Sequence, residues 1–193
     1  MSHQNELDLS YLAGIMDGEG YVGLSVNDRK RGGRQYYPRW TITNCNKAII
    51  DECVRILDNN SIAYHIVEWQ PHSKLHKYRY TIDATGFRRA LKGLWVIEPY
   101  LVGKKPQARL VLGFIWSRLK CGTAYQHIPY SEEEILLHQS CKDLNASGPI
   151  ILREYMPKSA AYADKMYSEL RAKGVEATET MARLERPEGF ERL

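Results

Sequence analysis

Two acidic residues, Asp17 and Glu19, stand at the end of a segment that could support metal chemistry. Apolar side chains recur at helical spacing over residues 7–18, which predicts a helix there. The C-terminal end of a helix disfavours negative charge, so a divalent cation that neutralises the carboxylates would explain their position. Metal ions held by carboxylates can supply both the nucleophilic water and the charge neutralisation that phosphodiester hydrolysis requires.

The same segment contains two glycines, Gly14 and Gly18, which lie four residues apart and therefore on one helix face. Glycine inside a helix costs about 1 kcal/mol relative to alanine. A sequence that accepts this cost twice indicates that another backbone approaches closely. A second helix fits, because small residues at this spacing permit tight crossing.

Positive charge is concentrated in the first two thirds of the chain. Residues 1–120 contain 18 Lys and Arg against 11 Asp and Glu, whereas residues 121–193 contain 9 against 12. The basic residues gather in the windows 27–47 and 65–92. Clustered positive charge predicts a surface that binds a polyanion, although a solvated basic surface would give the same count.

Composition excludes several other classes of protein. No apolar run approaches the roughly 18 residues of a membrane span, and the N-terminus resembles neither a secretory signal nor a transit peptide. The four cysteines lack a C-x-x-C spacing and are expected to be free thiols in a reducing compartment. We expect an intracellular protein without a membrane partner, in a bacterial or phage-host cytoplasm, or in an organelle if organelle-encoded.

Hydrophobic periodicity predicts the elements that must position these residues. Alternating patterns predict two hairpins, each apolar on one face, with Ile66 and Ile82 facing the core. The expected fold is α+β, a single antiparallel sheet covered by helices on one face and open on the other. The strands are expected at 21–30, 37–43, 62–70 and 76–83, and the helices at 7–18 (capped by Asp8 or Ser10), 46–59, 85–97, 105–119, 131–144 and 157–173.

The segment LAGIMDGEG, residues 12–20, resembles the LAGLIDADG motif of homing endonucleases. It retains Leu-Ala-Gly, the second glycine and both acidic positions, with glutamate in the last. Residues 98–108 are similar to the family's second region, in which Pro-aromatic-Leu and lysines precede Gln-Ala at the start of a helix. The resemblance to the single-motif, homodimeric branch covers residues 7–120.

This resemblance implies a fold and a function. The fold would be the family's αββαββα core, with a four-stranded antiparallel DNA-binding sheet, over residues 1–120. Residues 121–193 would form a C-terminal helical extension with a mobile acidic tail. The protein would be an intron-encoded endonuclease that cuts both strands of a long, nearly palindromic DNA site as a homodimer and leaves 3′ overhangs. Its cofactor would be Mg²⁺, with Mn²⁺ or Ca²⁺ able to substitute for binding.

The resemblance also assigns roles to individual residues. Glu19, with Gly18 beside it, would bind the metal over one scissile phosphate. Lys104 would orient or activate solvent near the cleaved bond. Asn46 would organise water at the metal, although Asn is also favoured as the N-cap of the following helix. The motif helices would pair at a dimer interface formed by Leu12, Gly14, Ile15, Asp17 and Gly18.

The polar faces of the strands would enter the major groove, which is about 12 Å wide and admits a two-stranded ribbon. Arginines are candidates for guanine or phosphate contacts, and short polar side chains for adaptable or water-mediated ones. The expected DNA-binding residues are Ser25, Asn27, Arg29, Lys30, Arg31, Arg34, Tyr37, Arg39, Thr41, Thr43, His65, Val67, Trp69, Lys74, Lys77, Arg79 and Thr81.

Two other functions fit parts of the sequence. A relative that has lost cleavage would act as an intron-splicing maturase, with intron RNA as its partner, or as a DNA-binding regulator. Retention of Glu19 and Lys104 argues against this loss, although splicing cofactors can keep both. A general RNA-binding module would instead need several aromatic residues on the polar strand faces, where this sequence has mostly Arg, Ser, Thr and Asn.

Overall fold

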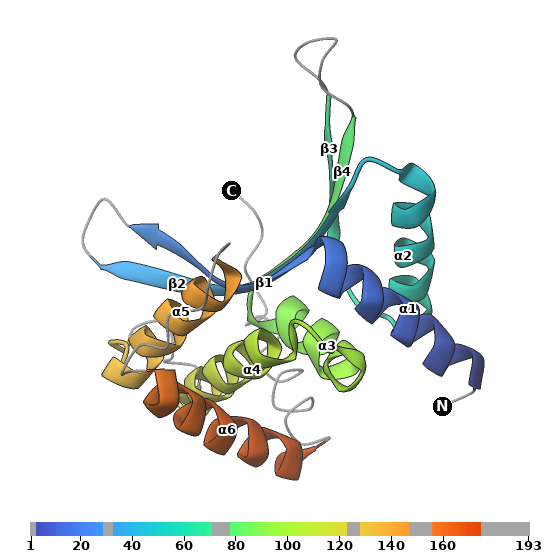
Figure 1. Ribbon diagram of the computed structural model, residues 1–193. Coiled ribbons are helices and arrows are strands. Elements are labelled where there is room, and N and C mark those ends of the chain that lie inside the picture. The colour runs from blue at the N-terminus through green and yellow to red at the C-terminus, as the bar shows by residue number, and fades with distance from the viewer. Residues whose placement is uncertain (1–2, 29–32, 71–77, 123–127, 147–155, 175–193) are drawn as a thin grey trace, which may run out of the picture.

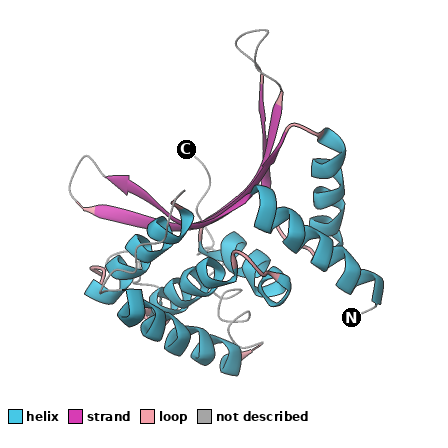
Figure 2. Ribbon diagram, in the orientation of Figure 1, coloured by secondary structure: helices cyan, strands magenta, loops and turns pink. Residues whose placement is uncertain are grey.

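The computed structural model describes residues 3–28, 33–70, 78–122, 128–146 and 156–174. Over these ranges the fold is α+β, as predicted (Figure 1, Figure 2). The first elements are α1 (His3–Glu19), β1 (Gly20–Asp28), β2 (Arg34–Asn44), α2 (Lys47–Asn59), β3 (His65–Trp69) and β4 (Arg79–Thr85). They are followed by α3 (Phe87–Ile97), the 3-10 turn η1 (Glu98–Tyr100), α4 (Lys105–Leu119), α5 (Glu132–Asn145) and α6 (Met156–Lys173).

The four strands form one antiparallel sheet in the order β1-β2-β4-β3. The helices lie on one side of this sheet, and the hairpins β1–β2 and β3–β4 spread apart above them (Figure 1). The C-terminal end of α1 lies against the sheet, because β1 starts at Gly20, the residue directly after the helix. None of the helices in the described residues covers the other face of the sheet, as the alternating strand pattern predicts.

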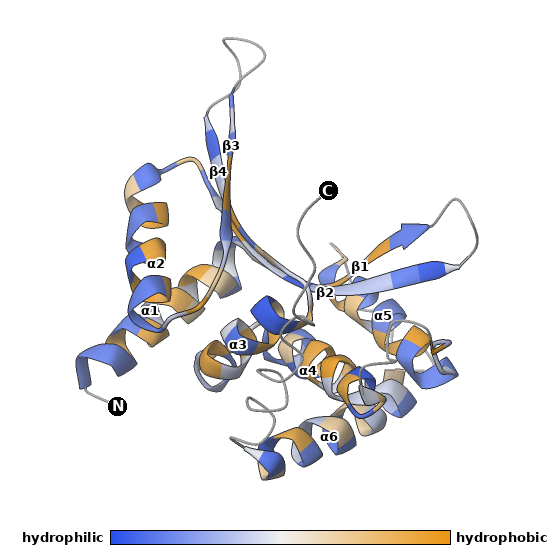
Figure 3. Ribbon diagram, turned by 180° about the vertical axis from the view of Figure 1, so that it is seen from behind, coloured by the Kyte–Doolittle hydropathy of each residue, from blue (hydrophilic) through white to orange (hydrophobic). Residues whose placement is uncertain are grey.

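The core lies between the sheet and the helices. Trp40, Ile42 and Ile82 project from the strands and are fully buried. The hydrophobic residues of α4, visible along its length in Figure 3, place this helix at the centre of the helical layer. Gly93 on α3 lies against Trp40, and a Cβ there would be 2.6 Å from the indole Nε1. Only glycine therefore allows α3 to pack this closely against the sheet.

The helices after residue 120 share this core. Apolar residues of α5 and α6, including Leu137 and Leu170, are buried in the same cluster as the residues of α1 and the sheet. Gly113 marks the close crossing of α4 and α6, since a Cβ there would lie 3.0 Å from the Ala163 carbonyl oxygen. Arg118 also pairs with Glu134 of α5 at 3.1 Å, with both side chains buried. The predicted acidic tail lies outside the described residues.

The prediction for the start of α1 was wrong. The helix begins at His3, so both proposed caps, Asp8 and Ser10, lie inside it. The Asp8 carboxylate pairs with Arg55 of α2 at 3.0 Å and accepts a hydrogen bond from Gln4. A buried acid within a helix is tolerated when it has such partners, and this partner comes from a helix 47 residues further along the chain.

The prediction that Ile66 faces a covered core was also wrong. Ile66 is paired with the buried Ile82 and lies on the helix side of the sheet, yet it is 46% exposed. Every residue of β3 is exposed, because this edge strand extends past the helices. Alternation in a sequence sets which face a side chain takes, but not how far the covering layer reaches.

Candidate functional site

The C-terminal end of α1 is tied to the loop that precedes α4. The Asp17 carboxylate accepts hydrogen bonds from the backbone N–H groups of Val102, Gly103 and Lys104, at 2.8, 3.0 and 2.7 Å. Burial raises the pKa of Asp17, but the three backbone donors outweigh it, so the pKa lies below its ordinary value of 3.8. These contacts explain an acid at a helix C-terminus without a cation at this residue.

Lys104 completes the same contact. Its ammonium group donates to the backbone carbonyl of Asp17 at 2.5 Å. Carbonyls in the last turn of a helix have no partner within the helix, and a cation there is favoured by the helix dipole. The structure therefore brings Lys104 to the end of α1, although 87 residues separate it from Asp17 in sequence.

Glu19 is the last residue of α1, and its side chain is exposed. The chain turns directly into β1 at Gly20, where a Cβ would lie 2.4 Å from the Met16 carbonyl oxygen. This close approach requires glycine and fixes the position of Glu19 between the helix and the sheet. Glu19 and Lys104 are thus presented from one end of α1.

The oxygen donors at this end of α1 could supply some of the ligands of a hard cation, with the remaining ligands coming from outside the chain. Across the described ranges, no group of three or more His, Cys, Asp or Glu side chains could hold a metal within one chain. Mg²⁺ is commonly bound by one or two carboxylates together with substrate phosphates. The Glu19 carboxylate and the backbone at Gly18 suit that arrangement, and they do not make a complete protein cage.

Asn46 has the capping role that the sequence left open. It is the N-cap of α2, and its Oδ1 accepts a hydrogen bond from the Ala48 N–H at 3.0 Å. Its own N–H donates to the Asn44 side chain at 2.8 Å. The side chain is exposed at the start of the helix, and the amide Nδ2 takes no part in the capping bond. A role for Asn46 toward solvent stays a prediction.

The pairing register places the predicted polar strand residues on the open face of the sheet. Cross-strand partners share a face, and the pairs Tyr21–Thr41, Thr41–Asp83 and His65–Asp83 connect all four strands. Thr41 itself is buried, at 9% exposure, so it offers little surface to a ligand. Among the residues expected to bind DNA, the register places the following on this face: Ser25, Asn27, Tyr37, Arg39, Thr41, Thr43, His65, Val67, Trp69, Arg79 and Thr81.

Arginines on the sheet are held by neighbouring side chains. Arg39 forms an ion pair with Asp83, whose other carboxylate oxygen accepts a hydrogen bond from Thr85 at 2.5 Å. Near the end of the other hairpin, the Arg79 guanidinium lies 5.2 Å from the centre of the Trp69 ring. Asp83 was not among the expected site residues, although its position in the alternating strand pattern already indicated the polar face.

Five of the expected DNA-binding residues cannot be placed. Arg29, Lys30, Arg31, Lys74 and Lys77 lie outside the described residues. The first three lie between β1 and β2, and the two lysines at 74 and 77 lie between β3 and β4. Their contacts with DNA remain predictions from the sequence.

Arg34 starts β2 and pairs with Asp28 at 3.1 Å. Both side chains are mostly exposed. By the pairing register Arg34 takes the same face as the buried Tyr36, so it lies on the helix side of the sheet and not on the open face where its DNA contact was expected.

One face of α1 is uncovered. Leu7 and Tyr11 are 52% and 42% exposed, and Gly14 and Gly18 continue the same face at helical spacing. A Cβ added at either glycine would meet nothing within 4 Å. The sequence analysis missed Leu7 and Tyr11, although their spacing from the glycines was the available signal.

The opposite face of α1 belongs to the core. Leu12, which we expected at a dimer interface, is fully buried within the protomer, so its side chain does not lie on the uncovered face. Asp17 is held by the loop at residues 102–104. Ile15 is half-buried and packs against the core. The motif alone could not separate these positions, because both faces of the helix are apolar.

Replacing Asp17 with Asn is expected to lower the free energy of unfolding at pH 7 by about 1–3 kcal/mol, because hydrogen bonds to a charged acceptor are lost. Because its folded pKa lies below 3.8, the wild-type carboxylate stabilises the fold above that value, and the stabilisation is lost as pH falls through the folded pKa. The variant should therefore show a shallower loss of stability below about pH 4. Urea unfolding across this pH range measures both effects.

Asp51→Asn is the control for this measurement. Asp51 pairs with Lys47 on the surface of α2, and both side chains are more than half exposed. Its replacement should change the unfolding free energy by less than about 1 kcal/mol. Equal stability of Asp17→Asn and Asp51→Asn would contradict the structural role of Asp17.

Comparisons with families and curated proteins give no match. Solved structures do match. The homing endonuclease I-CvuI, in complex with its target, has a TM-score of 0.58 and 18% identity over 88% of this chain and 98% of its own. The archaeal intron-encoded homing endonuclease I-Vdi141I, complexed with DNA, has a TM-score of 0.54 and 16% identity, covering 83% of this chain and 97% of its own.

The LAGLIDADG homing endonuclease I-LtrWI, bound to target DNA, has a TM-score of 0.53 and 16% identity. The match covers 80% of this chain but 48% of I-LtrWI. The chain therefore has the fold of the LAGLIDADG homing endonucleases, which confirms the resemblance drawn from residues 12–20. Among the residues that the structure describes, no helix is both long enough and apolar enough to cross a membrane.

Proposed function

We propose that this chain is a sequence-specific DNA endonuclease that hydrolyses phosphodiester bonds with Mg²⁺. The observation that carries the proposal is the end of α1, where Glu19 is exposed and the ammonium group of Lys104 is bound to the backbone carbonyl of Asp17, two residues before it. The fold shared with I-CvuI and I-Vdi141I, whose structures contain DNA, supports a DNA substrate. Structures of I-CvuI with Ca and with Mg support a divalent cation.

Each group at this end of α1 has a separate task. Glu19, with the backbone at Gly18, would hold the cation, which when bound supplies charge neutralisation at the phosphate and a more acidic water. Lys104 is a cationic donor fixed in place before substrate arrives, and it would orient solvent or stabilise developing charge. Asp17 would keep the loop at residues 102–104 in register with α1. The exposed Asn46 would order solvent nearby.

The active assembly would be a homodimer formed through the uncovered face of α1. One copy of this chain corresponds to about half of I-LtrWI, which supports two copies in the complete enzyme. Leu7, Tyr11, Gly14 and Gly18 would form the contact, with Ile15 at its edge. Two copies place two Glu19 carboxylates near one another, which suits cleavage of both strands of a nearly palindromic site. The 3′ overhangs and an intron-encoded origin follow from the family resemblance.

The open face of the sheet would contact the DNA. Two spread hairpins in each copy give a long surface, and a two-stranded ribbon fits the major groove. Trp69 and Arg79 lie stacked near the end of one hairpin, with Trp69 49% exposed. They can contact the sugar-phosphate edge there. Arg39 and its neighbours occupy the middle of the face, where base edges would be read.

Cleavage selection from a randomised double-stranded DNA library with Mg²⁺ tests the proposal. We expect recovery of a long, nearly symmetric site, cut on both strands, with no cutting when the cation is chelated. A parallel arm measures binding to the selected DNA and to structured intron RNA. Binding without cutting in every metal tested would contradict the endonuclease and favour a maturase or a DNA-binding regulator.

A further inference from the structure

A buried carboxylate, Glu98, stands at the start of the segment that carries Lys104. Glu98 is 2% exposed, and its two oxygens accept hydrogen bonds from three side chains. Arg109 Nε donates to one oxygen at 2.9 Å, and Arg171 Nη2 and the Tyr167 hydroxyl donate to the other at 2.9 and 2.6 Å. Two of these donors belong to α6, about 70 residues further along the chain.

Arg171 binds more than the carboxylate. Its guanidinium lies 3.9 Å from the centre of the Trp95 ring and donates to the Trp95 carbonyl at 3.3 Å. Its Nε also donates to the Tyr167 hydroxyl at 3.0 Å. The last turn of α3, Glu98 and α6 are therefore joined through one guanidinium, whose planar set of donors makes several directed contacts at once.

Only a short stretch of chain separates this cluster from the cleavage centre. Glu98 is the first residue of η1, and the backbone N–H groups of residues 102–104 hold Asp17. Three residues, 99–101, lie between the two anchored parts, and Pro99 fixes one of the backbone angles. If Glu98 moves, these three residues can compensate for little of the movement, so Lys104 moves as well.

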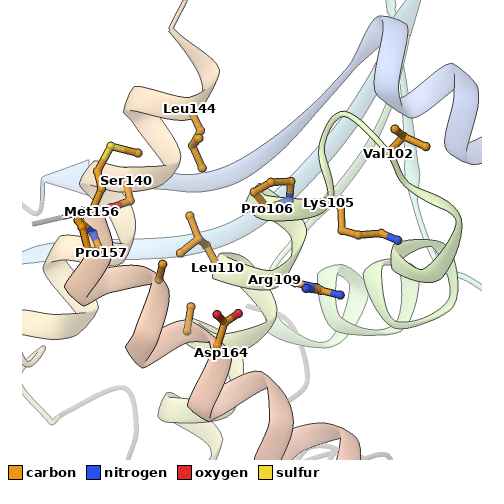
Figure 4. Close-up of a pocket in the computed structure, with 12 residues that line it drawn as sticks. Val102, Lys105, Pro106, Arg109, Leu110, Ser140, Leu144, Met156, Pro157 and Asp164 are labelled. Atoms are coloured by element: carbon orange, nitrogen blue, oxygen red, sulfur yellow. The ribbon is translucent and has the colours of Figure 1, made fainter. Parts of the chain in front are cut away.

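Beside the close crossing of α4 and α6 at Gly113, the start of α4 borders a region that side chains do not fill completely. A mainly apolar cavity of about 520 Å³ lies between α4, α5 and α6, lined by residues such as Leu110, Leu144 and Met156 (Figure 4). Arg109 lines this cavity and extends away from the apolar side chains (Figure 4). The polar contacts at Glu98 therefore add directed restraints, beside the close α4–α6 crossing at Gly113, on where α6 meets the segment.

From this geometry we infer that Tyr167 and Arg171 are positioning residues for cleavage: through Glu98 they hold the 98–104 segment so that Lys104 sits at the end of α1. The inference rests on the proposed endonuclease activity for its functional readout. Under this proposal the region after residue 120 supports cleavage by positioning Lys104, and not by contacting DNA. Neither residue touches the substrate in this proposal.

Tyr167→Phe and Arg171→Met test the inference, with Lys120→Met as the matched control. Lys120 joins α4 to α6 through Glu169 at 2.7 Å and makes no contact with Glu98. The readouts are the single-turnover cleavage rate with Mg²⁺, DNA affinity with Ca²⁺, and hydrogen exchange of the backbone amides of residues 102–104. Tyr167→Phe removes one hydroxyl group and leaves every charge in place, so it remains informative if Arg171→Met unfolds.

We expect both variants to cut at least about tenfold more slowly, because small displacements of reacting groups are costly, while affinity changes by less than about twofold. Exchange at the three amides should rise in both variants and stay unchanged in Lys120→Met. Arg171→Lys, which retains the charge, should recover part of the rate. If Tyr167→Phe matches Lys120→Met in both rate and exchange, the inference is overturned. If the wild-type protein cuts no DNA, the proposed function fails, and the exchange data alone decide whether α6 holds the segment.

Discussion

Replacing Glu19 with Gln is expected to lower the DNA cleavage rate by a factor of about a thousand or more, while DNA affinity stays equal or becomes tighter. The amide keeps the size and shape of the side chain but loses the charge that would hold the proposed cation. A cation contributes several kcal/mol of transition-state stabilisation, and each 1.4 kcal/mol corresponds to about tenfold in rate. Affinity is spared because removal of a carboxylate near a phosphate relieves repulsion.

Glu6→Gln provides the comparison for this experiment. Glu6 is an exposed acid in the first turn of the same helix, far from the end that carries Glu19. The two variants lose the same charge from one element, so a general charge effect would appear in both. Cleavage rates with Mg²⁺ and binding curves with Ca²⁺ separate chemistry from affinity. Near wild-type cleavage by Glu19→Gln would remove the basis for the metal site.

Replacing Gly14 with Leu is expected to convert the proposed dimer into monomers and so to abolish cleavage of both strands. Gly14 is exposed in the protomer, and a Cβ there meets nothing within 4 Å, so the isolated fold has room for a larger side chain. At a tight helix crossing the same side chain would meet its symmetry mate. Overpacking costs about 1–3 kcal/mol for each site, and a dimer contains two, which weakens association by about thirtyfold or more.

Sedimentation over a range of protein concentrations measures this effect, and circular dichroism checks that the fold is retained. Ala161→Leu serves as the control, because it places the same leucine side chain at an exposed position of α6. We expect the control to sediment like the wild-type protein. A Gly14→Leu variant that remains dimeric would show that the two copies meet through some other surface.

The sequence predicted the type and order of the elements because their signals are local. Period-two and helical patterns marked both hairpins and each helix, and Ser131 with Glu134 gave a capping box that the structure contains. The start of α1 was missed because Asp8 is stabilised by Arg55, a residue of another helix. Local patterns carry no information about such partners.

The candidate site residues were selected from the motif and from the family's second region, and their roles stay predictions. Glu19 and Lys104 could be selected by resemblance, but the bonds from residues 102–104 to Asp17 depend on contacts across more than 80 residues. The contact between Glu98 and Arg171 has the same origin. The burial of Leu12 depends on which side of α1 faces the sheet, and a helix that is apolar on both sides does not specify this.

The pairing of Arg39 with Asp83 has a consequence for selectivity. A free arginine loses about 0.5–1.5 kcal/mol of side-chain entropy when a ligand immobilises it, whereas Arg39 is already restrained by its neighbour. The adjacent negative charge also weakens its attraction to phosphates at arbitrary positions along a duplex. In the proposed DNA complex, Arg39 would therefore be suited to discriminating one nucleotide edge from another, and general attraction to nucleic acid would be left to the exposed cations around it.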